Sequence, residues 1–373
     1  MYLDAGGRAP VHPAARAAFD ADLDEGWADP RRLHAEGRRA RLLLDAARQA
    51  FADTLGCRTE EIHLSPGPTA TLHAAVRAVA HGRRRTGPAV VTSAVERSAL
   101  LAAARYAAGD AFVTVPVDRL GRVDLPAWAD AVATPGVALA ALQHANGEVG
   151  TLQPLAEAHA AARAAGVPLL VDAGASVGHV DVPVAWDLLA ADPADWGGPA
   201  GIGVLAVRAR VRATPAWPED EDAWFPGGVS VPAAVGAAAG LRAVIADHDR
   251  ADTHRRTLVD RLRTSLDQVP DVDVVGDPDH RLPHVLTFSC LYVDGEALVT
   301  ELDRRGFAVG SGSACTSSAL EPSHVLAAMG ALTHGNVRLA LPREVTAADV
   351  DRFAAVLPEV VADVRRTTGT AGL

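Results

Sequence analysis

Cys315 stands in the stretch GSGSACTSS, residues 310–318, where glycine and small hydroxyl residues surround the thiol. Such a composition is typical of an exposed polar loop. A cysteine in this setting ionises when nearby donors or a cation favour the thiolate, which is the form that attacks sulfur. The chemistry expected at Cys315 is therefore nucleophilic attack on a sulfur atom.

The other two cysteines, Cys57 and Cys290, are predicted to be small buried residues, and Cys290 lies within the apolar run VLTFSCLYV. The three cysteines are widely spaced, which favours neither a disulfide framework nor a zinc site. The 14 histidines form no HExxH pattern, so the sequence predicts no metal site.

The sequence contains no lysine, because arginine accounts for the whole Lys+Arg total of 35. A lysine amine is the group that forms an imine with a carbonyl substrate or cofactor. The formal net charge of −11 argues against a general nucleic-acid binder. Because there is neither a signal-like N-terminus nor an uninterrupted run of eighteen apolar residues, we expect a cytoplasmic protein and no membrane partner.

Short apolar runs alternate with helical segments up to about residue 210. The runs are PAVVTSA, AFVTVPV, VALAALQ, VPLLVDAG and IGVLAVRA, and residues 35–56 have helical apolar spacing that ends in glycine. This alternation predicts an α/β fold in which helices sandwich a mainly parallel sheet. A long helical stretch over 232–269 and the runs VDVVGD, HVLTFSCLY and NVRLALP, with helices between them, predict a smaller α+β unit. We expect a large domain at 1–240, whose N-terminal segment packs on a small domain at 241–373 that carries the cysteine loop.

The order of motifs along the chain resembles that of the cysteine desulfurases, which are class V aminotransferases of fold type I. The resemblance spans almost the whole chain and rests on SGSACTSSALEPSHVL together with YLDAGGRAPVHP, ADPRRLHAEGRRAR, LSPGPTATLHAA, LQHANGEVGTLQP, LLVDAGASVGHV, GGPAGIGVLAVR and NVRLAL. It implies a homodimer that uses pyridoxal phosphate (PLP), bound as an imine to a lysine, as an electron sink. It also implies that the loop cysteine accepts the substrate sulfur as a persulfide and passes it on.

The resemblance identifies the positions at which this chain differs from the family. The family motif HKxxGPxG aligns with ADWGGPAG, which places Ala194 at the histidine and Asp195 at the imine-forming lysine. Glu96 stands where the family has a histidine that stacks on the cofactor ring. Donors to the cofactor are also replaced, at Pro68, Gly147, Ala175 and Gly228.

Other positions keep the family residue. Asp172 matches the aspartate that pairs with the pyridinium nitrogen, and Asn146 matches the first asparagine of the NNE motif. The resemblance implies that both belong to a remnant cofactor pocket. Arg338 matches the arginine that clamps the substrate carboxylate, which a guanidinium binds through two parallel hydrogen bonds.

The sequence thus predicts a desulfurase-like protein that binds no cofactor covalently and holds PLP non-covalently at most. We expect Cys315 to accept a persulfide, and the chain to act as a sulfur carrier with a sulfur donor or acceptor protein. One alternative is a pseudoenzyme or scaffold that pairs with an active desulfurase, as a heterodimer rather than a homodimer. Another is an enzyme of different chemistry, with Asp195 or Glu96 as general base.

Overall fold

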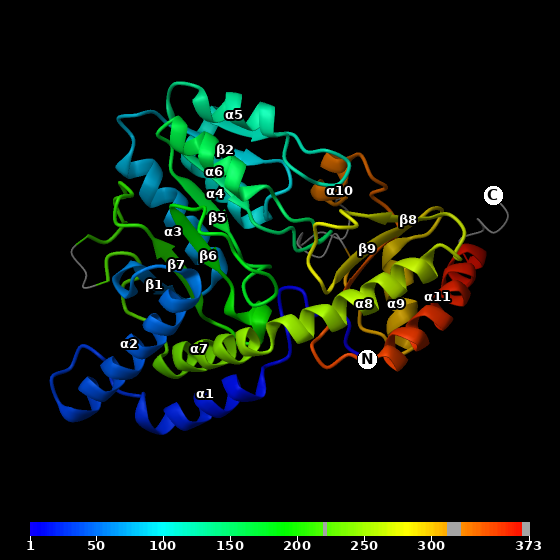
Figure 1. Cartoon of the computed structure of the whole chain (residues 1–373), viewed down its shortest axis with the longest axis horizontal. Helices are drawn as coiled ribbons and strands as arrows, with labels where there is room; N and C mark the ends of the chain where they lie inside the picture. The colour runs from blue at the N-terminus through cyan, green and yellow to red at the C-terminus, as the bar shows by residue number, and fades with distance from the viewer. Residues whose placement is uncertain (219–221, 312–321, 368–373) are drawn as a thin grey trace.

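The computed structural model describes residues 1–218, 222–311 and 322–367. They form a seven-stranded sheet of order β1-β7-β6-β5-β4-β2-β3 and a three-stranded sheet of order β10-β9-β8. Figure 1 shows the two sheets beside each other, with α7 and α8 running end to end from the larger sheet to the smaller one. No helix in these described ranges is long and apolar enough to cross a membrane.

The large sheet is mainly parallel, as the alternation of runs predicts. Strands β2 to β6 pair in parallel, whereas β7 runs antiparallel to both β6 and β1. Every residue of β4 is buried, because helices cover both faces of the sheet. The strands are β1 (Ile62–Ser65), β2 (Ala89–Ser93), β3 (Phe112–Val115), β4 (Val137–Gln143), β5 (Leu169–Asp172), β6 (Leu188–Ala191) and β7 (Gly203–Val207).

The helices of the large sheet divide between its two faces. Alternate residues of a strand point to opposite faces, and in β4 Leu139 packs with α3 and α4 while Leu142 packs with α2, α5, α6 and α7. The predicted helix over 35–56 is confirmed, since α2 ends at Gly56 with a left-handed φ of 64°. The helices are α1 (Pro13–Glu25), α2 (Ala35–Leu55), α3 (Pro68–Gly82), α4 (Ser98–Ala108), α5 (Leu125–Ala133), α6 (Leu155–Ala164) and α7 (Val231–Ala246).

The helical stretch expected over 232–269 is divided into two helices. The chain forms α7 and then α8 (His248–Leu266), which are separated at Asp247, where φ is −112° and ψ is 9°. Aspartate favours helix ends over helix interiors, and the Asp247 carboxylate accepts hydrogen bonds of 2.7 and 2.9 Å from Arg250. The break lies at an aspartate that begins α8 and pairs with an arginine side chain in its first turn.

The small sheet is antiparallel and packs against α8, α9 and α11. In the strand-like run FAV, Ala308 forms an isolated bridge with Tyr2, and the next residue after the run, Gly310, forms one with Arg338. Asp4 pairs with Ala340 in the same way, so the N-terminal segment lies beside β10. The elements are β8 (Val272–Val275), β9 (Val285–Cys290), α9 (Gly295–Arg304), α10 (His324–Met329), β10 (Asn336–Ala340) and α11 (Ala347–Thr367).

Candidate functional site

A cavity of about 540 Å³ lies at the carboxyl ends of β2, β4 and β5, where ligands bind in open α/β sheets. The N-terminal segment and β10 close its other sides. Many of the positions singled out from the sequence meet there. They are Glu96, Asn146, Gly147, Asp172, Ala175, Asp195 and Arg338.

Other predicted positions lie elsewhere. Pro68 begins α3, Gly228 lines a different cavity, and the backbone oxygen of Ala194 accepts a hydrogen bond from Ala9. Cys315 lies outside the described residues. Ser311 and Pro322, which flank that segment, both line the cavity.

Asp172 pairs with a residue that the sequence reasoning missed. Nε and Nη2 of Arg97 lie 2.5 and 2.6 Å from the two carboxylate oxygens of Asp172. Asp172 is 2% exposed at the end of β5, and Arg97 is the N-cap residue of α4. The family motif directs attention to Glu96. The sequence feature that could have revealed the pair is the arginine at the next position, Arg97.

Asp195 is fixed on the short 3-10 helix η3 (Pro193–Trp196). Its Oδ1 accepts a hydrogen bond of 2.7 Å from the backbone N–H of Gly7, and its Oδ2 lies 3.0 Å from Nε2 of His179. Nη1 of Arg255 lies 3.2 Å from Nδ1 of that ring. Burial lowers the pKa of His179, so the ring is neutral and donates from Nε2 towards Asp195. Nε2 also lies 3.1 Å from the backbone oxygen of Asp195, and within the described ranges Oδ2 has no hydrogen-bond partner, so Oδ1 is the oxygen that ties this side chain to the fold.

Glu96 is completely buried beside the cavity. Its Oε1 accepts hydrogen bonds of 2.5 Å from Oγ of Ser93 and 3.1 Å from the backbone N–H of Gln143. Burial raises the pKa of this carboxyl to about 8, so it is mainly protonated at neutral pH. At neutral pH only a minority of Glu96 is therefore in the carboxylate form that could accept a proton.

Two further carboxyl groups on the cavity wall have raised pKa values. Burial raises the pKa of Glu148 to about 7, against the lowering effect of a 2.6 Å hydrogen bond from Oγ of Ser323. Burial, and then the charge of Asp195, raise the pKa of Asp192 to about 6. The cavity wall therefore changes its charge across the neutral range.

Asn146 builds a turn. Its Oδ1 accepts hydrogen bonds from the backbone N–H groups of Glu148 and Val149, at 2.8 and 2.9 Å, and its Nδ2 donates to Val95 at 3.0 Å. These contacts use most of the bonding capacity of the amide. The assignment of Asn146 to cofactor binding therefore has little support in the contacts that it makes.

Arg338 extends from β10 into the cavity, but it already has an ionic partner. Its Nη2 donates a 2.6 Å hydrogen bond to Oδ1 of Asp4, which the N-terminal segment brings beside β10. Within the described ranges its Nε has no hydrogen-bond partner. One side of the guanidinium is thus occupied by the protein itself.

The residues of the cavity do not fit PLP. The chain has no lysine to form an imine, and Arg97 already occupies both oxygens of Asp172. Outside the cavity, at the start of α3, Pro68 has no N–H to donate, and the hydroxyl groups of Ser65 and Thr71 lie 2.5 Å apart. We derive no chemical step through this cofactor.

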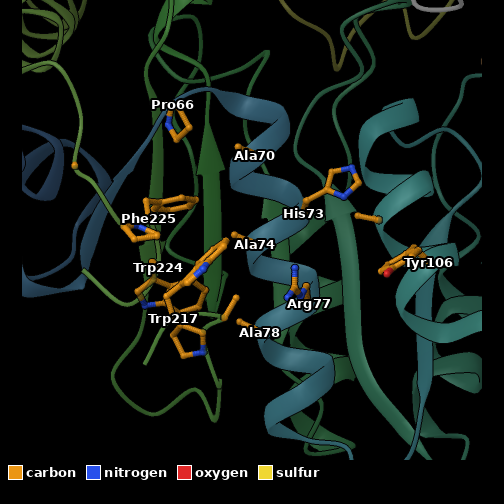
Figure 2. A pocket seen from close by; sticks show the side chains of 15 residues that line it. Pro66, Ala70, His73, Ala74, Arg77, Ala78, Tyr106, Trp217, Trp224 and Phe225 are labelled. Carbon is orange, nitrogen blue, oxygen red and sulfur yellow. The ribbon is translucent and has the colours of Figure 1, made fainter. Parts of the chain in front are cut away.

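A second cavity, of about 580 Å³, opens between α3, α4 and the segments 215–217 and 224–228. In Figure 2, α3 lies between Tyr106 on one side and Trp217, Trp224 and Phe225 on the other. Tyr106 is 85% exposed and Trp217 is 49% exposed. Large exposed apolar groups that gather in this way are typical of a surface that binds another molecule.

The two described cysteines are poor nucleophiles. Cys290 is buried, as predicted, whereas Cys57 is only partly buried. Burial raises the pKa of Cys57 to about 11 and that of Cys290 to about 12. Neither thiol is appreciably ionised near neutral pH.

The chain is similar to known proteins over almost its whole length. The family described as Aminotransferase class-V matches residues 1–353. The chain is 32% identical to cysteine desulfurase IscS of Methanosarcina thermophila, over 98% of this chain and 93% of that one. It is 35% identical to a cysteine desulfurase of Cereibacter sphaeroides, over 98% and 96%. A solved structure described as a NifS-like protein has a TM-score of 0.89 and 23% identity, covering 97% of this chain and 99% of its own.

Proposed function

Since this chain belongs to the cysteine desulfurase family of class-V aminotransferases, we propose that it carries sulfur as a persulfide without PLP chemistry. The observation on which this proposal rests is the position of Asp195. Its Oδ1 accepts a hydrogen bond from the backbone N–H of Gly7 and the residue is 1% exposed, so the position aligned with the imine-forming lysine holds a buried carboxylate tied to the N-terminal segment. With no lysine elsewhere in the sequence, no side chain of this chain can replace it.

Cys315 is the proposed sulfur acceptor. The two described thiols are held protonated by burial, whereas GSGSACTSS favours an accessible thiol. In the exchange, the Cys315 thiolate attacks the outer sulfur of a persulfide on a donor protein. The donor S–S bond breaks, a new S–S bond forms on Cys315, and the donor thiolate takes a proton from water. The exchange involves no net oxidation or reduction.

The test is transfer from an active desulfurase. The protein is incubated with a lysine-bearing cysteine desulfurase and cysteine, separated without reductant, and measured by intact mass. We expect the mass of one added sulfur atom, located on the Cys315 peptide and removed by dithiothreitol. Absence of the adduct, while a known acceptor in the same mixture becomes loaded, contradicts the proposal.

Matched cysteine variants identify the acceptor. Cys315→Ser removes the proposed nucleophile, and Cys57→Ser removes a partly buried thiol with a high pKa. We expect the first variant to lose the adduct and the second to keep it. Equal loading of Cys315→Ser and the wild type would assign the sulfur to another thiol.

The apolar groove in Figure 2 supports a second candidate, a scaffold subunit that pairs with an active desulfurase. Tyr106 and Trp217 expose aromatic surface that a partner chain would bury. Native mass spectrometry of the co-expressed pair tests this. We expect a heterodimer that Trp217→Ser weakens and that Cys315→Ser leaves intact. If only homodimers or monomers form, the pairing is wrong.

A further inference from the structure

Arg97 lies where the family resemblance puts a cofactor ring, with its guanidinium against Asp172. Its backbone is fixed, because its carbonyl oxygen accepts hydrogen bonds of 2.9 and 3.1 Å from the N–H groups of Leu100 and Leu101 in the first turn of α4. A planar guanidinium that donates twice to one carboxylate is strongly oriented. The cation is therefore a fixed part of the cavity floor.

Gly174 makes room for this arrangement. A Cβ atom built on Gly174 would lie 2.7 Å from Nη2, 2.9 Å from Cζ and 3.0 Å from Nη1 of Arg97. The guanidinium thus packs directly against the Gly174 backbone, at a distance that a methyl group would prevent. Gly174 does not have a positive φ, so alanine is compatible with its backbone. Because Gly174 has no side chain, the guanidinium of Arg97 can pack against its backbone.

The pair changes the electrostatics of the cavity. Asp172 is neutralised by the protein itself, and Nη1 of Arg97 also lies 4.0 Å from the Asp192 carboxylate. A ligand with a protonated ring nitrogen would lose its carboxylate partner and meet a fixed positive charge. Such a ligand can bind only where the guanidinium leaves Asp172.

We propose that Arg97, held against Gly174, occupies the ring position as a built-in cation and determines that the cavity excludes pyridinium ligands. The proposal concerns the cavity and does not depend on Cys315. The experiment on sulfur transfer and the experiment on ligand exclusion can therefore give opposite results.

Pyridoxamine 5′-phosphate is the probe, because it carries the ring and the phosphate but cannot form an imine with the protein. Its affinity is measured by isothermal titration calorimetry for the wild type, Arg97→Ala and Gly174→Ala. Both substitutions should free Asp172, one by removing the guanidinium and the other by displacing it. We expect affinity at least tenfold above that of the wild type in each variant.

Arg8→Ala is the matched control, since Arg8 lines the same cavity and carries the same charge. It should bind the probe no better than the wild type does. Gly174→Ala should add no further affinity in an Arg97→Ala background, because both changes act through one side chain. Thermal unfolding shows which variants are folded. If Arg97→Ala does not fold, the result for Gly174→Ala tests the proposal, because the new methyl group contacts only the flexible end of the Arg97 side chain. The proposal is wrong if the wild type binds as tightly as the folded variants do.

Discussion

Nε2 of His179 lies 3.0 Å from Oδ2 of Asp195, and both side chains are at least 96% buried, with relative exposures of 4% and 1%. Asp195 stands at the position that the family resemblance assigns to lysine. His179 in turn contacts Arg255, whose Nη2 donates a 2.6 Å hydrogen bond to Asp252 on α8. Asp195 is thus the end of a polar network that joins η3 to α8.

Asp195→Lys should therefore destabilise the protein. The substitution places a second cation near Arg255 and leaves the Gly7 N–H without its acceptor. A buried charge without a compensating partner costs about 3–5 kcal/mol. Asp195→Asn, which keeps an acceptor oxygen, should cost about 1–3 kcal/mol.

Urea unfolding followed by circular dichroism measures both effects. Asp110→Asn, at an exposed aspartate, is the control and should leave the unfolding free energy unchanged. If Asp195→Lys is as stable as the wild type, the network does not hold Asp195 in place.

Local patterns in the sequence predict the elements of the fold but not the pairing at the site. Apolar runs identify the strands, because a strand buried on both faces is apolar throughout, as β4 is. The Arg97–Asp172 pair joins positions 75 residues apart, and the Asp195–Gly7 contact joins positions 188 apart. Such pairs depend on how the strand ends and the N-terminal segment meet in space.

Residue identity alone also misleads where a retained polar residue has a structural role. Asn146 keeps the family residue, yet its amide is used within its own turn and by Val95. Arg338 keeps its identity too, but Asp4 arrives from the far end of the chain as its partner. Only the contacts separate a residue that is free to bind a ligand from one that is already engaged.

The buried Glu96 carboxyl should make stability decrease as pH rises. Its pKa in the folded protein is about 8, above the ordinary value of 4.5, so the folded state binds the proton more tightly than the unfolded state does. The resulting stability is fully present below the unfolded pKa and is lost as pH rises to about 8. Glu96→Gln mimics the protonated form and lacks this loss.

Unfolding free energies measured from about pH 5 to about pH 8 test this effect. The difference between Glu96→Gln and the wild type should grow by on the order of 1–3 kcal/mol in favour of the variant over that range. Glu148 and Asp192 titrate in the same direction, so the difference between the two proteins is the informative quantity. A constant difference across the pH range would mean that Glu96 does not titrate there.

Asp4 should compete with carboxylate ligands for Arg338. The ion pair occupies Nη2, while Nε has no hydrogen-bond partner within the described ranges. Asp4→Asn removes the charge and should raise the affinity for L-serine, a thiol-free analogue of cysteine, by about threefold to tenfold, equivalent to about 1 kcal/mol. Calorimetric titration measures the change. Arg338→Met in the same background should abolish the gain, and a gain that persists would place the carboxylate elsewhere.

The three thiols should differ sharply in reactivity. The pKa values of about 11 for Cys57 and about 12 for Cys290 leave almost no thiolate on either residue near neutral pH. Iodoacetamide, which reacts with thiolates, should therefore modify Cys315 first in the native protein. Peptide mass spectrometry over a time course gives the order, with Cys57 expected before the fully buried Cys290.

Cys315→Ser separates exposure from ionisation in the same experiment. Under native conditions the variant should remain almost unlabelled, whereas in denaturant both remaining cysteines should react. Labelling should also accelerate with pH in the wild type at values where Cys57 and Cys290 stay protonated. If the variant is alkylated as fast as the wild type, the reactive thiol is Cys57, and Cys315 loses its distinguishing property.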